Sequence, residues 1–218
     1  MHKKGFIFDL DGVIVDTAKY HYLAWKKLAE SIGIDFNKNQ NEQLKGVSRV
    51  ASLKKILAWA DKQVSDKEFE ELLVQKNTDY LNYIKTMDKS EILPDVKRVL
   101  HFLKKNNQPI ALGSASKNAK TILNKIHLMS KFDVIIDGNE VTKAKPNPEV
   151  FLKAAEQINI NPKNCIVFED AIAGIQAANK AGMISVGIGN KQNLNEANYV
   201  FKDFTKINES FLKQLIKK

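Results

Sequence analysis

Short, uniformly apolar runs alternate with helix-forming segments through most of the chain, and this alternation restricts the possible folds more than any other feature. The apolar runs cover residues 5–9, 109–113, 132–136, 164–168 and 184–188, and the helical patterns cover residues 95–106, 118–126, 148–158 and 172–181. Short runs without polar alternation are typical of strands that are buried on both faces. The sequence therefore predicts an α/β fold, a Rossmann-like parallel sheet with helices on both sides.

One stretch, residues 17–88, interrupts the alternation. It has no strand pattern, and its apolar residues recur at helical spacing in three segments. We therefore predict that residues 17–88 form a small inserted helical domain, and that residues 1–16 and 89–218 together form the core domain. The end of the chain, residues 208–218, predicts a short amphipathic helix.

Composition excludes several other classes of protein. With 218 residues, 44% of them hydrophobic and 27% charged, the chain has the make-up of a globular protein rather than a disordered one. Its one cysteine, Cys165, cannot form an internal disulfide, which excludes a disulfide-stapled secreted domain. No apolar run reaches the roughly 18 residues of a membrane helix, and Asp9 and Asp11 interrupt any signal-peptide core. We therefore expect a cytoplasmic protein without a membrane partner.

The formal net charge of +9 admits three interpretations. A basic surface can bind nucleic acid through its phosphates, can be simply solvated, or can steer anionic metabolites into a site. Only Arg49 and Arg98 are arginines, the residue suited to bidentate phosphate recognition, and the lysines are spread along the chain. These features favour a solvated surface, so we predict no nucleic-acid partner.

The motif DLDGVIVDT, residues 9–17, is the strongest indication of chemistry. Asp9 and Asp11 are two residues apart at the end of the first strand, so their carboxylates project to the same side, and Gly12 lets the chain turn sharply. Ligands bind at this end of open parallel sheets. Two confined like charges repel each other, and a hard cation such as Mg²⁺, which prefers oxygen ligands, would relieve the repulsion.

A second acidic pair, Glu169 and Asp170, follows the apolar run at residues 164–168. If that strand adjoins the first one, four carboxylates converge on one point and form a Mg²⁺ site. Asp170 is also well suited to cap the helix that follows it, so capping is the alternative interpretation of this pair.

Two further loops fit the same site. The segment GSASKN, residues 113–118, brings small hydroxyl residues to a helix start, where free backbone N–H groups bind phosphate; a serine N-cap is the alternative. Lys143 and Lys145 also precede a helix start, where the dipole disfavours a cation unless an anion lies nearby; a solvated loop lysine is the alternative. Together the motifs predict phosphoryl transfer to an aspartate, with Mg²⁺ and a lysine offsetting the charge.

These four motifs resemble, in order, those of the haloacid dehalogenase superfamily. The resemblance spans residues 5–190, and the helical segment resembles the small cap domain of the phosphoglucomutase-like branch. It implies that Asp9 is the nucleophile, that Asp11 is the general acid and base, and that Ser114 and Lys145 complete the catalytic group. The Mg²⁺ ligands that it implies are the Asp9 side chain, the Asp11 backbone carbonyl, Glu169 and Asp170.

The resemblance extends to the substrate site. The segment LKGVSRVASL, residues 44–53, is similar to the substrate-specificity loop of mutases in that branch, whereas Ala171 stands where the branch often has serine. The substrate-binding residues that the resemblance implies are His21, Trp25, Lys45, Gly46, Val47, Arg49, Ser52, Lys76, Ala115, Ser116, Lys117 and Asn118. Trp25 can instead belong to the core of the cap, and His21 and Lys76 can be helix-surface residues.

The implied activity is a Mg²⁺-dependent mutase that interconverts β-glucose 1-phosphate and glucose 6-phosphate through glucose 1,6-bisphosphate and an Asp9-phosphate. A sugar-phosphate phosphatase of the same architecture is the alternative. Arg49 favours the mutase, because a mutase has to hold a second phosphate far from the Mg²⁺. A non-enzymatic phospho-acceptor domain is disfavoured by the helical insert and by the pairing of Asp9 with Asp11. We expect a monomer whose partners are small hexose phosphates.

Overall fold

A computed structural model describes residues 3–217 and contains one parallel sheet with the strand order β3-β2-β1-β4-β5-β6. The strands are β1 (Gly5–Phe8), β2 (Ile110–Gly113), β3 (Val134–Ile136), β4 (Cys165–Glu169), β5 (Ile184–Ile188) and β6 (Tyr199–Phe201). The predicted parallel α/β fold is confirmed. The sequence analysis missed β6, because three half-buried residues at a sheet edge give no distinct apolar run.

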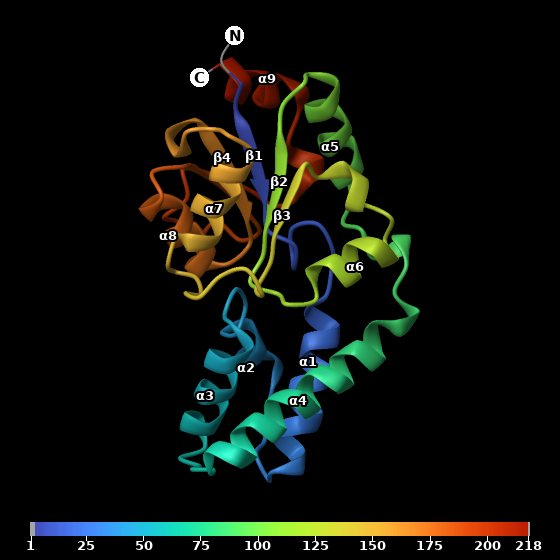
Figure 1. The fold of residues 1–218 in the computed structure, drawn as a ribbon, viewed down its shortest axis with the longest axis vertical. Coiled ribbons are helices and arrows are strands. Elements are labelled where there is room, and N and C mark those ends of the chain that lie inside the picture. The colour runs from blue at the N-terminus through green and yellow to red at the C-terminus, as the bar shows by residue number, and fades with distance from the viewer. Residues whose placement is uncertain (1–2, 218) are drawn as a thin grey trace.

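Helices cover both faces of the sheet, and four more lie beyond the ends of its strands (Figure 1). The helices are α1 (Ala18–Ser31), α2 (Lys38–Glu42), α3 (Arg49–Trp59), α4 (Asp66–Tyr83), α5 (Val96–Lys105), α6 (Ala119–Lys125), α7 (Glu149–Gln157), α8 (Ile172–Lys180) and α9 (Glu209–Lys217). Helices α5, α6 and α9 pack on one face of the sheet, and α7 and α8 pack on the other. Each helix that the sequence predicts in the core is present, with its ends shifted slightly.

The apolar strands supply both layers of this core. In β1, Phe6 and Phe8 belong to the hydrophobic cluster under α5, α6 and α9, whereas Ile7 belongs to the cluster under α7 and α8. Phe8 stacks on Phe168 of the neighbouring strand, with ring centroids 4.6 Å apart. Successive side chains of a strand point to opposite faces, so burial on both faces explains why the run has no polar alternation.

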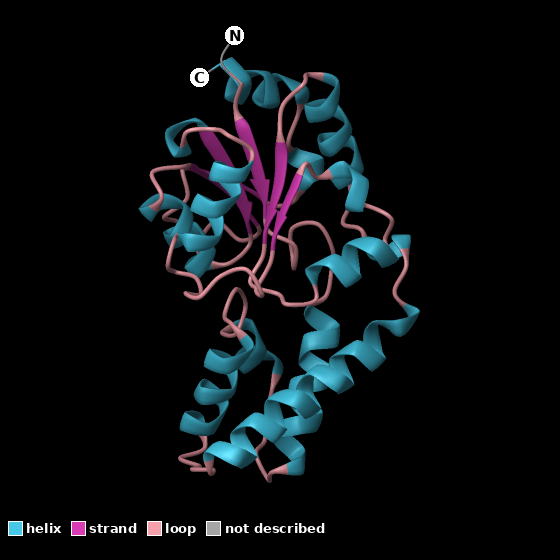
Figure 2. Ribbon diagram, in the orientation of Figure 1, coloured by secondary structure: helices cyan, strands magenta, loops and turns pink. Residues whose placement is uncertain are grey.

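Helices α1 to α4 form a separate all-helical body at the carboxyl ends of the strands (Figure 2). Its interior is a hydrophobic cluster of its own, which includes Trp25, Leu28, Phe36, Leu53 and Leu72. The sequence analysis missed α2, a polar five-residue helix that a capping box stabilises at its start. Within the described part of the chain, no helix has the length and hydropathy needed to cross a bilayer.

Two connections that lie side by side join the helical body to the sheet. Val15 forms an isolated antiparallel bridge with Ile92, and the backbone N–H of Asp16 donates to the carbonyl of Glu91 over 3.1 Å. The Glu91 carboxylate accepts hydrogen bonds from Lys19 and from the Tyr20 hydroxyl, at 2.7 and 2.6 Å. These contacts tie the first turn of α1 to the returning chain.

Candidate active site

A cavity of about 470 Å³ is lined by loops at the carboxyl ends of the strands and by residues of the helical body. The predicted site residues that line it are Asp9, Asp11, His21, Trp25, Lys45, Gly46, Val47, Arg49, Ser52, Lys76, Ala115, Ser116, Lys117, Asn118, Lys145 and Asp170. Ser114 and Glu169, the two remaining predicted residues, are fully buried and do not line the cavity. The chain thus brings segments from both bodies to one cavity.

Parallel pairing of β1 with β4 places the two acidic pairs side by side. Phe8 is in register with Phe168, so Asp9 and Glu169 leave the sheet next to each other. Asp9, Glu169 and Asp170 each offer an oxygen, and these oxygens lie within 4.8 Å of one another. The backbone N–H at the start of α8 donates to Glu169 over 2.7 Å, and no side chain caps that helix. The N-cap interpretation of Asp170 is therefore wrong.

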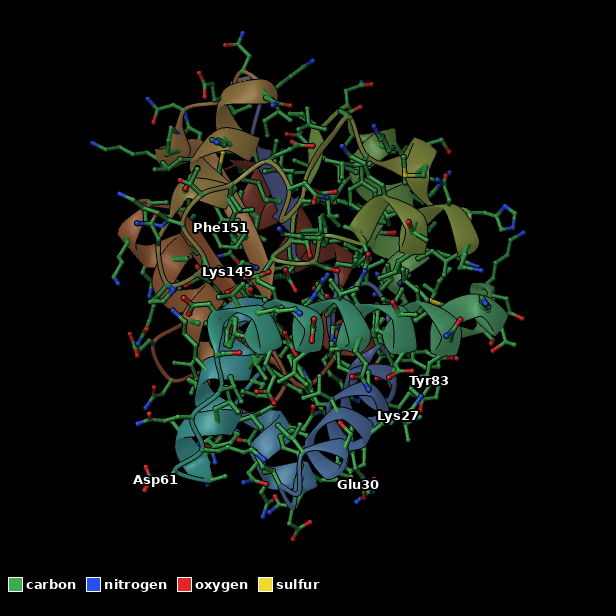
Figure 3. All side chains as sticks on the ribbon, turned by 60° about the horizontal axis from the view of Figure 1, so that its bottom comes forward. Lys27, Glu30, Asp61, Tyr83, Lys145 and Phe151 are labelled. Atoms are coloured by element: carbon green, nitrogen blue, oxygen red, sulfur yellow. The ribbon has the colours of Figure 1, made fainter. Side chains whose placement is uncertain are left out.

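Lys145 is the cation of this cluster. Its Nζ lies 2.7 Å from Oδ1 of Asp9 and 2.6 Å from Oε1 of Glu169, and the residue is only 5% exposed. Figure 3 places Lys145 beside Phe151, whose ring centroid is 4.7 Å from Nζ. Burial lowers the pKa of Lys145, but the two carboxylates outweigh burial and raise it. The solvated-loop interpretation is wrong for Lys145, whereas Lys143 is exposed.

The remaining charge of the cluster is negative. Burial, opposed by Lys145 and reinforced by Glu169 and Asp11, raises the pKa of Asp9 to about 7. Burial, Glu169 and Asp9 also raise the pKa of Asp170 well above its usual range. These three carboxyl groups form a donor set of hard oxygens whose mutual repulsion a Mg²⁺ ion would relieve.

Two glycines make room for the carboxylates. Gly12 has a φ of +78°, and a Cβ there would lie 2.1 Å from Oδ2 of Asp170. A Cβ on Gly174 would lie 1.8 Å from Oε1 of Glu169. The sequence analysis identified Gly12 from the turn that it permits. It missed Gly174, because its close approach to Glu169 exists only in the folded chain.

Asp11 faces a different set of partners. The Thr17 hydroxyl donates a short hydrogen bond to Oδ1 of Asp11, and Nε2 of His21 lies 3.8 Å from the same oxygen. Burial raises the pKa of Asp11, but His21 and Thr17 outweigh burial and lower it. The Asp11 side chain is 29% exposed, so it can exchange a proton with a bound molecule. The sequence analysis did not predict Thr17 as a site residue, although it identified the motif of residues 9–17 that contains it.

The helical body contributes a basic group to the cavity. Lys76 is 3% exposed, with its Nζ 3.0 Å from Nδ1 of His21 and 4.8 Å from the ring centroid of Trp25. Burial and the nearby Arg49 lower the pKa of Lys76 to about 7. The helix-surface interpretation of Lys76 is therefore wrong. Trp25 fulfils both interpretations, since it belongs to the core of the helical body and also lines the cavity.

The loop GSASKN is held by its serine hydroxyls. Oγ of Ser114 accepts from the N–H of Ser116 over 3.1 Å, and Oγ of Ser116 accepts from the N–H of Asn118 over 3.2 Å. Helix α6 begins after Asn118 without a side-chain cap, so the serine N-cap interpretation is wrong. The Asn118 amide donates to Asn77 of α4 over 2.9 Å and thereby joins the loop to the helical body.

The loop before α3 reaches the acidic cluster from the other side. A Cβ on Gly46 would lie 2.8 Å from the Cβ of Ala171, and Nζ of Lys45 lies 4.0 Å from Oδ2 of Asp170. The sequence analysis missed the nearby Asn41, a buried polar residue that lines the cavity, because α2 has no apolar pattern.

The arrangement can carry out group transfer between a carboxylate and a bound anion. Oδ2 of Asp9 accepts no hydrogen bond from residues 3–217, while Lys145 neutralises the neighbouring oxygen. Asp11 can transfer a proton within the same cavity. From the helical body, Arg49 adds a positive charge, and Lys76 adds another when it is protonated.

Comparisons with known proteins agree with this chemistry. The family of haloacid dehalogenase-like hydrolases matches residues 3–182. The chain is 43% identical to β-phosphoglucomutase of Bacillus subtilis over 201 residues, which cover 91% of this chain and 89% of that protein. A crystal structure of β-phosphoglucomutase from Clostridium difficile matches with a TM-score of 0.95 and 44% identity, covering 99% and 98% of the two chains. The chain is also 32% identical to the fructose-1-phosphate phosphatase of Escherichia coli over 186 residues, which cover 84% of this chain and 95% of that protein.

The acidic cluster predicts that Mg²⁺ stabilises the fold. At a Mg²⁺ concentration of about 100 times its dissociation constant, the free energy of unfolding should rise by about 2.7 kcal/mol, measured by thermal unfolding. Asp170→Asn should abolish this rise without lowering the melting temperature of the metal-free protein, since it removes one of the repelling charges. The exposed control Glu156→Gln should respond to Mg²⁺ like the wild type. Equal responses of all three proteins to Mg²⁺ would contradict the assignment of Asp170 as a ligand of the ion.

The lowered pKa of Lys76 predicts a pH-dependent stability. Between about pH 7 and pH 10 this lysine is mostly neutral in the folded state and protonated in the unfolded state, which therefore binds more protons. The wild type should accordingly gain stability relative to Lys76→Met as the pH rises through this window, by up to about 4 kcal/mol. Urea unfolding of both proteins across the window measures the difference. Parallel pH profiles would show that Lys76 keeps an ordinary pKa.

Proposed function

The chain belongs to the haloacid dehalogenase-like hydrolase family, and on that premise we propose that it interconverts β-glucose 1-phosphate and glucose 6-phosphate. The observation that carries the proposal is the shared cavity. The core supplies a nucleophilic carboxylate with a paired lysine, and the helical body supplies Arg49 and Lys76. A bisphosphate intermediate needs an anion site at each end, and the similarity to two β-phosphoglucomutases supports this use of the cavity.

In the first half-reaction Asp9 is the nucleophile. Its free oxygen, Oδ2, attacks the phosphorus of one phosphoryl group of glucose 1,6-bisphosphate, and the bond between that phosphorus and the sugar oxygen breaks. Asp11 gives a proton to the leaving sugar oxygen. Lys145 offsets the charge beside Asp9, and Ser114 completes the catalytic group by ordering the loop that carries Ser116.

The second half-reaction reverses these roles. Glucose 6-phosphate, which remains after removal of the 1-phosphoryl group, leaves the site, and β-glucose 1-phosphate presents its 6-hydroxyl to the Asp9-phosphate. Asp11 accepts the proton of that hydroxyl, a bond forms between the phosphorus and the sugar oxygen, and the bond between the phosphorus and Asp9 breaks, which regenerates glucose 1,6-bisphosphate and the free carboxylate. The lowered pKa of Asp11 favours its ionised form, which is the form required of a base.

The metal ligands follow from the acidic cluster. The side chains of Asp9, Glu169 and Asp170, with the Asp11 backbone carbonyl, would hold Mg²⁺. When bound, the ion neutralises charge on the transferring phosphoryl group.

We assign the distal phosphate to Arg49, assisted by residues 116–118 of the core. A guanidinium binds phosphate in a fixed fork geometry that a lysine does not reproduce. The other substrate-binding residues in this proposal are His21, Trp25, Lys45, Gly46, Val47, Ser52, Lys76 and Ala115. In domain terms, residues 17–88 form the cap, and residues 1–16 and 89–218 form the core.

The proposal also covers the cellular location, the oligomeric state and the partners of the enzyme. It acts as a cytoplasmic monomer on small hexose phosphates in carbohydrate metabolism, without a nucleic-acid partner. Several lysines are paired with surface carboxylates, as in Lys26–Glu30, Lys104–Asp133 and Lys120–Glu140. Such pairing supports a solvated basic surface rather than a nucleic-acid site.

A sugar-phosphate phosphatase is the second candidate, favoured by the similarity to the fructose-1-phosphate phosphatase of Escherichia coli. It would use Asp9, Asp11 and Lys145 in the same way and would let water attack the Asp9-phosphate.

One assay separates the two activities. The purified protein receives β-glucose 1-phosphate and Mg²⁺, with and without glucose 1,6-bisphosphate, and glucose 6-phosphate and free phosphate are both measured. We expect glucose 6-phosphate to be the main product and to depend on the bisphosphate. Free phosphate as the main product would establish the phosphatase instead. Asp9→Asn should abolish both products, since the amide is a poor nucleophile.

The distal-phosphate assignment predicts that Arg49→Ala impairs the mutase far more than slow hydrolysis of the Asp9-phosphate, which needs only the core residues. The loss in kcat/KM for mutase turnover should correspond to about 2–5 kcal/mol, as for other desolvated charge pairs. Lys54→Ala, an exposed change on the same helix, is the control and should leave both rates unchanged. A parallel fall of both activities in Arg49→Ala would exclude Arg49 as the distal anchor.

A further inference from the structure

Asn41 carries a carboxamide that no group in the described chain binds. The residue lies on α2, is only 7% exposed and lines the cavity. Its backbone carbonyl accepts from the N–H of Leu44, but its side chain makes no hydrogen bond among residues 3–217. Within that range, the fully buried side-chain atoms without a partner are Oδ2 of Asp79 and the Tyr80 hydroxyl. The amide of Asn41 therefore keeps contact with open space, and the open space beside it is the cavity.

The other buried polar side chains that line the cavity have partners, with one exception. Hydrogen bonds join them in the pairs Thr17–Asp11, Lys76–His21 and Lys145–Asp9. The exception is Ser52, which is 2% exposed and makes no side-chain hydrogen bond in the part of the chain that the structure describes. Ser52 is one of the substrate-binding residues proposed above. Asn41 shares its burial, its place on the cavity wall and its lack of a protein partner, which favours the same use.

Local structure does not account for an asparagine at position 41. The residue that caps α2 is Asn37, whose capping box closes with Gln40. Inside a helix, asparagine is a weaker helix former than leucine or alanine. A buried apolar side chain would also add to the hydrophobic interior of the helical body and would leave no amide to satisfy. The amide therefore needs an explanation outside the fold of this body.

A carboxamide matches a hydroxyl group better than it matches a phosphate. It offers two N–H donors and an acceptor oxygen, and a hydroxyl both donates and accepts. A phosphate dianion uses only the donors and brings negative charge toward the amide oxygen. The cavity already supplies cations for phosphate, as Lys145 in the core and Arg49 in the helical body. The neutral groups that a hexose phosphate brings into such a cavity are its ring hydroxyls.

We propose that Asn41 is a specificity residue that forms a hydrogen bond with a ring hydroxyl of the bound hexose. The inference rests on the proposed function, which brings a hexose into the cavity. A sugar that enters displaces water from the amide, and it binds well only when one of its hydroxyls replaces the lost hydrogen bonds. A site built to bind a hydroxyl rejects the analogue without it, because the polar group of the site is then left without a partner. Asn41 thereby favours hexose phosphates over phosphate esters that have no ring hydroxyls.

The first test measures binding by calorimetry in the presence of Mg²⁺. Asn41→Leu keeps the approximate size of the side chain and should raise the Kd of glucose 6-phosphate about 10-fold, because a buried hydroxyl loses its partner. The Kd of inorganic phosphate, which has no sugar ring, should stay within about twofold of the wild-type value. Asn39→Leu, the same substitution at an exposed position of α2, is the matched control and should bind both compounds like the wild type. An unchanged Kd for glucose 6-phosphate, or an equal loss for inorganic phosphate, overturns the proposal.

The second test asks whether a hydroxyl is the partner. The 2-deoxy, 3-deoxy and 4-deoxy analogues of glucose 6-phosphate each lack one ring hydroxyl. For at least one of them, the Kd of Asn41→Leu should exceed that of the wild type by less than about threefold, because the hydrogen bond that the variant loses is already absent. An equal ratio of the two Kd values for all four compounds overturns the proposal, since the amide would then act through the shape of its loop.

Stability separates recognition of the sugar from a structural role. Because the Asn41 side chain has no partner among the described residues, the urea midpoint of Asn41→Leu should equal or exceed that of the wild type. A midpoint that falls would show that the amide supports the fold and would overturn the proposal. Asn41→Ala, which adds no bulk, should show the same loss of binding. A loss confined to Asn41→Leu is a steric effect and also overturns the proposal.

Product analysis separates this proposal from the proposed function. With β-glucose 1-phosphate, Mg²⁺ and glucose 1,6-bisphosphate, Asn41→Leu should lower kcat/KM about 10-fold whichever product forms, and Asn39→Leu should keep the wild-type value. If the wild type forms mainly free phosphate, the mutase function is wrong, and the 10-fold loss still supports the role of Asn41. If it forms glucose 6-phosphate and Asn41→Leu loses nothing, the mutase function stands and the role of Asn41 is wrong. A wild type that neither binds nor converts hexose phosphates overturns both.

Discussion

The ion pairs of Lys145 with Asp9 and Glu169 hold the centre of this molecule together. Parallel pairing of β1 with β4 puts two buried carboxylates side by side, and such a pair would repel strongly without a cation between them. Lys145 comes from the loop between β3 and α7, so the pairing also fixes that loop against the middle of the sheet. The geometry of Asp9 thus depends on a contact between residues 136 positions apart.

The core and the helical body contribute side chains of opposite charge to the cavity. The core holds the negative groups, at the place where the strand order reverses around β1, and the helical body holds Arg49 and Lys76. Within the described chain Lys76 has no carboxylate partner and is surrounded by His21 and aromatic rings, so an anionic ligand would favour its protonated form. The two connections beside Glu91 keep these halves facing each other.

The sequence predicts whatever depends on local pattern or on a motif. The buried strands and the pairs Asp9–Asp11 and Glu169–Asp170 could be identified because apolar runs and carboxylates at strand ends have distinct signatures. The role of Lys145 rather than Lys143, and the failure of Asp170 to cap α8, depend on how loops fold over the sheet. Gly174 gave no signal, because its close approach to Glu169 exists only once the turn between β4 and α8 has folded. The strand β6 and helix α2 were too short or too polar for periodicity to detect.

The strand order has a consequence for how this chain is made. β1 pairs with β2 on one side and with β4 on the other, so its second neighbour leaves the ribosome only after about three quarters of the chain. The helical body, which has its own hydrophobic cluster, can assemble during that interval. Until β4 emerges, Asp9 at the end of β1 lacks its partner carboxylates Glu169 and Asp170. The helical body can therefore form before the acidic cluster is complete.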